Sequence, residues 1–161
     1  MSQRIDRRDD SWILWIVVAA IGVHIIEEYA LDFPGWARVA LGAPVTWQDF
    51  HLVNAGVIVY SVACAMVAWR LPAFSLSAAS LVVLNALAFH LGSSAATGTY
   101  SPGTLSAIAL FVPSGLLAYR AAWRDGVLTR APLVWSILIG VLWHAFLGGA
   151  FAIRYFAPLY R

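Results

Sequence analysis

A histidine and two glutamates stand close together in the first apolar segment of the chain. Glu27 and Glu28 follow His24 at i+3 and i+4, so the three side chains share one face of a helix. Two side chains one helical turn apart can hold a single metal ion, and here that pair is His24 and Glu28. Glu27 then lies beside the ion, where it is placed to act as the catalytic base.

All the other histidines also fall in apolar segments. With a rise of 1.5 Å per residue, the four histidines and both glutamates come out in the same half of the membrane, the half remote from the N-terminus. Ionisable groups within a membrane are costly, so a shared depth indicates a shared site. We therefore predict five metal ligands, which are His24, Glu28, His51, His90 and His144.

Three more polar residues lie near this predicted site. Asn54 is an i+3 neighbour of His51 and is expected either to support a ligand or to bond another helix. Asn85 lies five residues before His90, about 140° away on an ideal helix, so the two converge only if that helix is distorted. Arg154 is expected to anchor its helix at the interface or to bind an anionic headgroup at the mouth of the site.

The elements that position these residues follow from composition. The chain has 161 residues, 61% hydrophobic and 11% charged, which is far too apolar for a soluble domain of this size. Five apolar runs are long enough to cross about 30 Å of hydrocarbon. They predict an all-α integral membrane bundle with spans at Trp12–Leu31, Gln48–Trp69, Ala73–Ala96, Thr104–Tyr119 and Pro132–Phe156.

These runs divide the chain into an N-terminal tail (1–11), a single transmembrane domain (12–156) and a C-terminal tail (157–161). The fourth run is short and contains Pro113, so it is the segment that could be re-entrant. It carries no ionisable group at the depth of the histidines, which predicts a peripheral, supporting helix. The other half of every span is expected to be almost free of polar residues.

Arginines orient the bundle. All ten basic residues are Arg, and seven of them lie on the side of the N-terminus against three on the other. The positive-inside tendency predicts that the N-terminus lies in the cytoplasm. The net charge of +2 sits in short loops and indicates no nucleic-acid partner; the expected partners are membrane lipids, and the oligomeric state is left open.

The segment His24-Ile25-Ile26-Glu27-Glu28 resembles the signature of the HXXEE family of small bacterial multi-span membrane proteins. It also has the geometry of the inverted zinc motif His-x-x-Glu-His, with a carboxylate in place of the second histidine. The family resemblance implies a metal site and a place in a bacterial inner membrane, but it supplies no reaction.

Three functional classes fit these residues. The first is a metal-dependent hydrolase acting on a lipid, isoprenoid or other amphiphile, with zinc as the expected ion. The second is a non-haem iron or manganese oxidoreductase with one or two ions, although helical di-iron proteins usually supply more carboxylates. The third is a metal or proton transporter or sensor. Polar groups confined to one half of the membrane favour a reaction chamber over a conduit.

Overall fold

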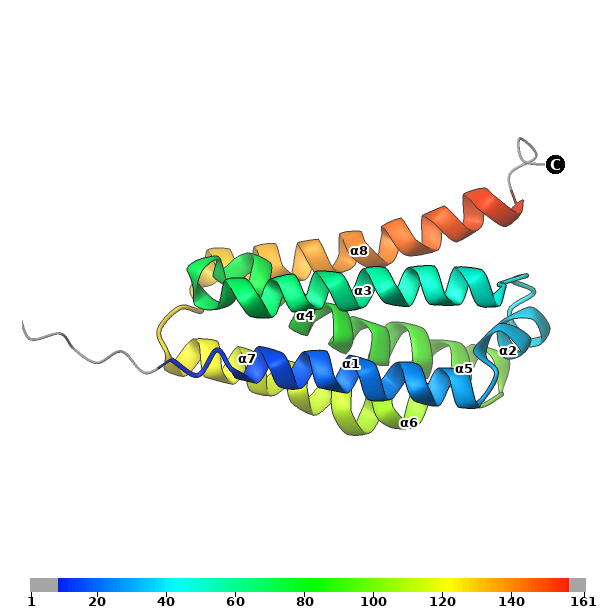
Figure 1. Cartoon of the computed structure of the whole chain (residues 1–161), viewed down its shortest axis with the longest axis horizontal. Coiled ribbons are helices and arrows are strands. Elements are labelled where there is room, and N and C mark those ends of the chain that lie inside the picture. The colour runs from blue at the N-terminus through cyan, green and yellow to red at the C-terminus, as the bar shows by residue number, and fades with distance from the viewer. Residues whose placement is uncertain (1–8, 157–161) are drawn as a thin grey trace, which may run out of the picture.

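The computed structural model describes residues 9–156, with side chains described for 9–146, and every regular element in this part is helical. The elements are α1 (Ile13–Ala30), α2 (Phe33–Ala40), α3 (Trp47–Val67), η1 (Ala68–Arg70), α4 (Pro72–Leu84), η2 (Asn85–Leu91), α5 (Gly92–Thr97), α6 (Thr104–Ser106), η3 (Ala107–Phe111), α7 (Val112–Arg124) and α8 (Arg130–Phe156). Several of them run on without a break, so the bundle consists of five long rods and the short helix α2 (Figure 1).

The prediction of an all-α bundle of membrane-length helices is confirmed. Four rods are long and apolar enough to cross a membrane, namely Ile13–Ala30, Trp47–Arg70, Pro72–Thr97 and Thr104–Arg124. The fifth, α8, has 27 residues, of which Arg130–Phe146 have described side chains. The fourth rod, in which Pro113 raised the possibility of a re-entrant segment, is one continuous helix of 21 residues.

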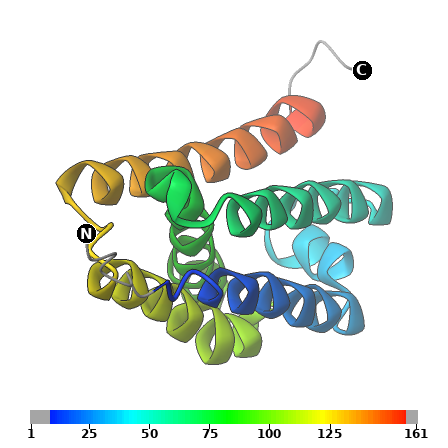
Figure 2. The same ribbon diagram turned by 60° about the vertical axis from the view of Figure 1, so that its left-hand side comes forward.

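The rod formed by α4, η2 and α5 is the centre of the bundle. Its helix α4 packs against α1, α3, α7 and α8, and α8 lies along one side of it (Figures 1 and 2). The face of α4 is made of small residues, so neighbouring helices approach closely. A Cβ placed on Gly140 of α8 would lie 2.7 Å from the Ser80 Cβ, and one on Gly115 of α7 would lie 3.0 Å from the Ala79 carbonyl oxygen.

Hydroxyl groups join the helices in this half of the bundle. The Tyr119 hydroxyl lies 2.6 Å from Ser80 Oγ and 2.7 Å from Ser136 Oγ, which links α7, α4 and α8. Tyr60 of α3 hydrogen-bonds Ser77 of α4. The expectation that this half is nearly free of polar groups holds for ionisable residues but not for hydroxyls, because small hydroxyl side chains can bond between helices and still be buried in hydrocarbon.

Two rods contain a π-helical stretch, η2 and η3, and the two stretches contact each other. In η3 the cause is local: Pro113 has no N–H to donate back into the preceding turn, so the helix before it rearranges. A π-helix bonds residue i to i+5 and brings side chains five apart toward one face. Asn85, the first residue of η2, and His90, its last but one, are such a pair.

Candidate metal centre

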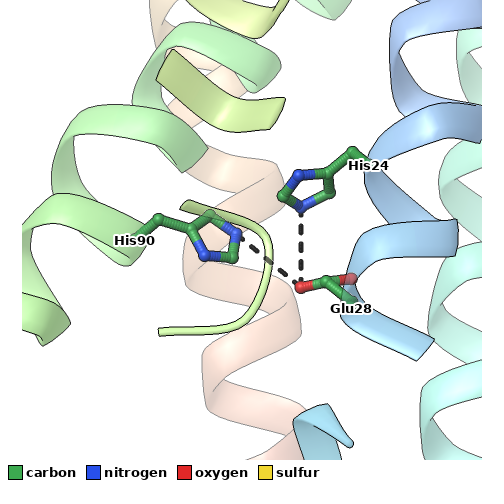
Figure 3. A group of neighbouring side chains, drawn as sticks. All are labelled: His24, Glu28 and His90. Carbon is green, nitrogen blue, oxygen red and sulfur yellow. Dashed lines mark ion pairs between the residues drawn. The ribbon is translucent and has the colours of Figure 1, made fainter. Parts of the chain in front are cut away.

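Three side chains from two rods meet where η2 passes the last turns of α1. His24, Glu28 and His90 each offer one ligand atom, and these atoms all lie within 4.8 Å of one another. His24 and Glu28 come from α1 and His90 from η2, and both imidazoles point their Nε2 at the same Glu28 oxygen (Figure 3). All three are buried, with exposed fractions of 4%, 7% and 0% for His24, Glu28 and His90.

Both imidazole nitrogens lie farther from Glu28 than a hydrogen bond allows, at distances close to those between the ligand atoms of a metal ion. His24 Nε2 lies 3.5 Å and His90 Nε2 lies 3.7 Å from Glu28 Oε1. Both distances exceed the 2.7–3.2 Å of an N–H···O hydrogen bond. A tetrahedral ion with bonds of about 2.0–2.2 Å holds its ligand atoms about 3.3–3.6 Å apart. His90 Nε2 has no hydrogen-bond partner among the described residues, so this nitrogen is open to a ligand.

A serine from the fourth rod fixes the tautomer of His24. The Ser106 hydroxyl donates to the Gly103 carbonyl oxygen, so its oxygen accepts from His24 Nδ1–H at 3.0 Å. With the proton on Nδ1, the Nε2 that faces Glu28 carries the lone pair that a metal requires. Ser101 Oγ lies 3.2 Å from His90 Nδ1 and orients that ring in the same way.

Gly103 closes the cluster from the side of the fourth rod. Its backbone has φ +95°, and a Cβ there would lie 2.6 Å from His24 Cε1, 2.7 Å from His90 Cε1 and 2.9 Å from Glu28 Cγ. A side chain at this position would collide with both imidazole rings and with the Glu28 side chain. Glycine is therefore required here for two reasons: it adopts the left-handed backbone conformation, and it lets the backbone approach the three cluster residues closely.

Glu27 points to a different partner from Glu28. Its Oε2 accepts from Ser106 N–H at 2.7 Å, and its Oε1 accepts from the Tyr100 hydroxyl at 2.6 Å and from Leu105 N–H at 3.2 Å. The carboxylate thus caps the start of the fourth rod and ties it to α1. Burial, and then the hydrogen bond to Glu27, raise the pKa of Tyr100, which keeps its hydroxyl protonated as a donor. This geometry favours a positioning role for Glu27; its role as a base stays a prediction.

A family model described as "Protein of unknown function with HXXEE motif" matches residues 15–118, more than half of the chain. The chain belongs to the HXXEE family. Neither the curated proteins nor the solved structures gave a match. The motif residues of this HXXEE chain are His24, Glu27 and Glu28, so the matched range includes the motif and its partner His90.

A cavity of about 200 Å³ adjoins the cluster. Its walls are largely apolar, and they come from α1, α2, α3, the α4–η2 rod, η3 and α8. Five polar residues line it: His24, Glu28, Asn54, Asn85 and His144. His144 and both asparagines thus share a cavity with two members of the cluster without belonging to the group of atoms within 4.8 Å.

The structure does not bring His51 to this centre. Its Nδ1 lies 2.6 Å from the Trp47 carbonyl oxygen of its own helix, and its exposed ring lies beside those of Tyr29 and Trp47. Arg154 lies in α8, but its side chain is outside the described residues. The five predicted ligands therefore divide into a buried trio, His144 on the cavity wall, and His51 at the surface of the bundle.

The prediction of a peripheral fourth helix was wrong, because its first residues contact the cluster through Gly103, Ser106 and the bonds to Glu27. A search for ionisable residues passed over these small residues. The run Ser101-Pro102-Gly103-Thr104 did carry a signal, since a Pro-Gly turn followed by a hydroxyl residue marks the sharp entry to a helix. The local sequence did not indicate which histidines this turn would face.

Proposed function

We propose that this HXXEE protein is a membrane-embedded, metal-dependent enzyme that hydrolyses a lipid or other amphiphile, with a divalent ion held by His24, Glu28 and His90. The observation that carries the proposal is the pair of Nε2 atoms at 3.5 and 3.7 Å from one carboxylate oxygen, with His24 held in the tautomer a metal needs. Two histidines and one carboxylate form a donor set of catalytic zinc sites, which leave a further position for water or substrate.

The residues around the ion divide the remaining work. Ser106 and Ser101 hold the imidazole rings, and Gly103 covers the cluster. The apolar cavity accommodates the chain of an amphiphile and keeps bulk water away from the reacting bond. An ion in such a site lowers the pKa of bound water to about 7 and polarises the bond to be cleaved. Zinc fits this donor set best, and iron or manganese would indicate the oxidoreductase instead.

The test is the metal content of detergent-purified protein, measured by elemental analysis. We expect about one zinc ion per wild-type chain, and a loss of at least about tenfold in Glu28→Gln, because the neutral amide is a poor ligand. His51→Phe is the matched control and should retain the ion, since His51 lies outside the cluster. Wild-type protein purified without metal, or equal metal in Glu28→Gln and wild type, would overturn the proposal.

The same measurement on Glu27→Gln separates the two roles of Glu27. A catalytic base can be removed with most of the metal retained, whereas a residue that positions Ser106 and Gly103 should weaken metal binding when it is altered. Equal loss of metal in Glu27→Gln and Glu28→Gln would instead indicate that both carboxylates are ligands.

We also propose that the protein lies in a bacterial inner membrane, as the resemblance to the HXXEE family implies, and that its N-terminus is in the cytoplasm, as the arginine distribution indicates. Single cysteines at Ser2 and Arg161, in a Cys64→Ala background, provide the test. A membrane-impermeant thiol reagent added to intact cells should label the C-terminal cysteine alone. Labelling of the N-terminal cysteine alone would invert the topology, and labelling of both would mean an even number of spans.

A further inference from the structure

The cavity beside the metal centre has a second polar region that the proposed chemistry does not use. Asn85, at the start of η2, and His144, on α8, line the same walls as His24 and Glu28. Most other lining residues are apolar, among them Val57, Val82 and Phe111. A few polar groups in an otherwise apolar cavity orient a ligand and select its chemical class.

Asn85 presents an acceptor without a donor. Its Oδ1 is buried and has no hydrogen-bond partner among the described residues. A carbonyl oxygen of an amide can only accept, and a buried acceptor left unpaired destabilises the folded protein. Asn85 is the first residue of a π-helical stretch, and such stretches occur frequently at functional sites. An O–H or N–H of a bound molecule would satisfy this oxygen.

His144 presents an acceptor as well. Its Nδ1 lies 3.0 Å from the Gly140 carbonyl oxygen, which can only accept, so Nδ1 carries the proton. The neutral ring then has its lone pair on Nε2. Asn85 of η2 and His144 of α8, each of which carries an acceptor atom, thus line a single apolar cavity.

We propose that the cavity binds a single-chain amphiphile whose polar group donates hydrogen bonds, a hydroxyl or an amide N–H, with Asn85 Oδ1 and His144 Nε2 as its acceptors. The apolar walls hold its alkyl or isoprenoid chain. Amphiphiles whose polar groups only accept, such as ethers and full esters, bind weakly. This inference names the substrate class of the proposed enzyme and rests on that function only for the statement that the bound molecule reaches the metal.

The experiment is a competition for photocrosslinking in lipid nanodiscs. The probe is 1-decanol with a terminal alkyl diazirine, and the crosslinked peptides are mapped by mass spectrometry. Unlabelled 1-decanol and decyl methyl ether are the competitors, compared at equal mole fraction in the membrane because they partition differently. We expect crosslinks in peptides that line the cavity, and competition by 1-decanol at least about tenfold stronger than by the ether, which corresponds to about 1.4 kcal/mol.

Two variants test whether Asn85 is responsible for the preference for the alcohol over the ether. Asn85→Leu removes the acceptor and should reduce the preference for the alcohol to threefold or less on the same arithmetic, about 0.65 kcal/mol. Asn54→Leu is the matched control, the same replacement of an amide by an alkyl group on another wall of the cavity, and should keep the wild-type preference. Equal competition by alcohol and ether in the wild type would overturn the inference, as would crosslinking spread evenly over the outside of the bundle.

Metal content of the same preparations keeps this test apart from that of the proposed function. Preference for the alcohol in a protein without metal would support the binding site and overturn the enzyme. One zinc ion per chain without preference for the alcohol would support the metal centre and overturn the ligand class.

Discussion

The central rod of the bundle, formed by α4, η2 and α5, is tightly packed in its first part and borders a cavity in its second part. In its first part, α4, serines and alanines lie against Gly140, Gly115 and Tyr119, and the helices α7 and α8 approach closely. In its second part, the helix widens into η2, buries His90 beside Glu28, and borders a cavity.

The difference lies in how polar groups are satisfied. The hydroxyls of α4 are small enough to bond back to their own helix and across to Tyr119, so nothing further is required there. In the second part, the Nε2 of His90 and the Oδ1 of Asn85 have no hydrogen-bond partner among the described residues. Such groups are costly inside a membrane, which supports the proposal that the second part carries the function.

The largest effect that would break this comparison is expected from Gly103→Ala. The added Cβ would lie within 2.9 Å of all three cluster residues and would occupy a positive φ. We expect metal affinity to fall by about a hundredfold or more, since the tightly packed ligands have to move. Chelator competition measures this directly. Gly98→Ala is the control, because its φ of +67° carries the same kind of strain but nothing lies within 4 Å. An equal loss of metal affinity in both variants would argue against a metal centre formed by these three residues.

Gly140→Ala tests the tightly packed part of the rod. Its Cβ would meet the Ser80 Cβ at 2.7 Å, so α8 should be pushed from α4 at a cost of about 1–3 kcal/mol in the free energy of unfolding. Thermal unfolding in detergent should show the loss while metal content stays near wild type. Gly22→Ala, where nothing lies within 4 Å, should leave the unfolding temperature unchanged or slightly raised. Loss of metal in Gly140→Ala would mean that the two parts of the rod are coupled.

Ser106→Ala should give the smallest of the three effects. Paired with Ser80→Ala, it is the most direct test of the difference between the two parts of the rod. It removes the acceptor for His24 Nδ1–H and should lower metal affinity by about tenfold, because the ring loses its fixed tautomer and orientation. Ser80→Ala deletes a hydroxyl of equal size that bonds Tyr119 in the packed part, and should lower stability by about 1 kcal/mol without changing metal affinity. Isothermal titration with zinc, together with thermal unfolding, distinguishes the two. Equal changes in metal affinity would contradict the division.

The sequence by itself determined the helices and much of the chemistry. Apolar runs of membrane length predicted the rods because a chain in hydrocarbon has to satisfy its backbone internally, and the i, i+4 spacing placed His24 and Glu28 on one face because helical geometry is local. The five-residue spacing of Asn85 and His90 showed that convergence would need a distorted helix, and η2 is such a distortion.

Only the tertiary structure decided which histidines meet. Depth along a helix is local and readable, but the rotation of one helix against another depends on how their small residues pack, so His51 and His90, similar by depth, end on the surface and in the cluster respectively. The roles of Gly103 and Ser106 were hidden for the same reason. Their importance lies in contacts with α1, about 80 residues earlier in the chain, and nothing in the local sequence specifies that partner.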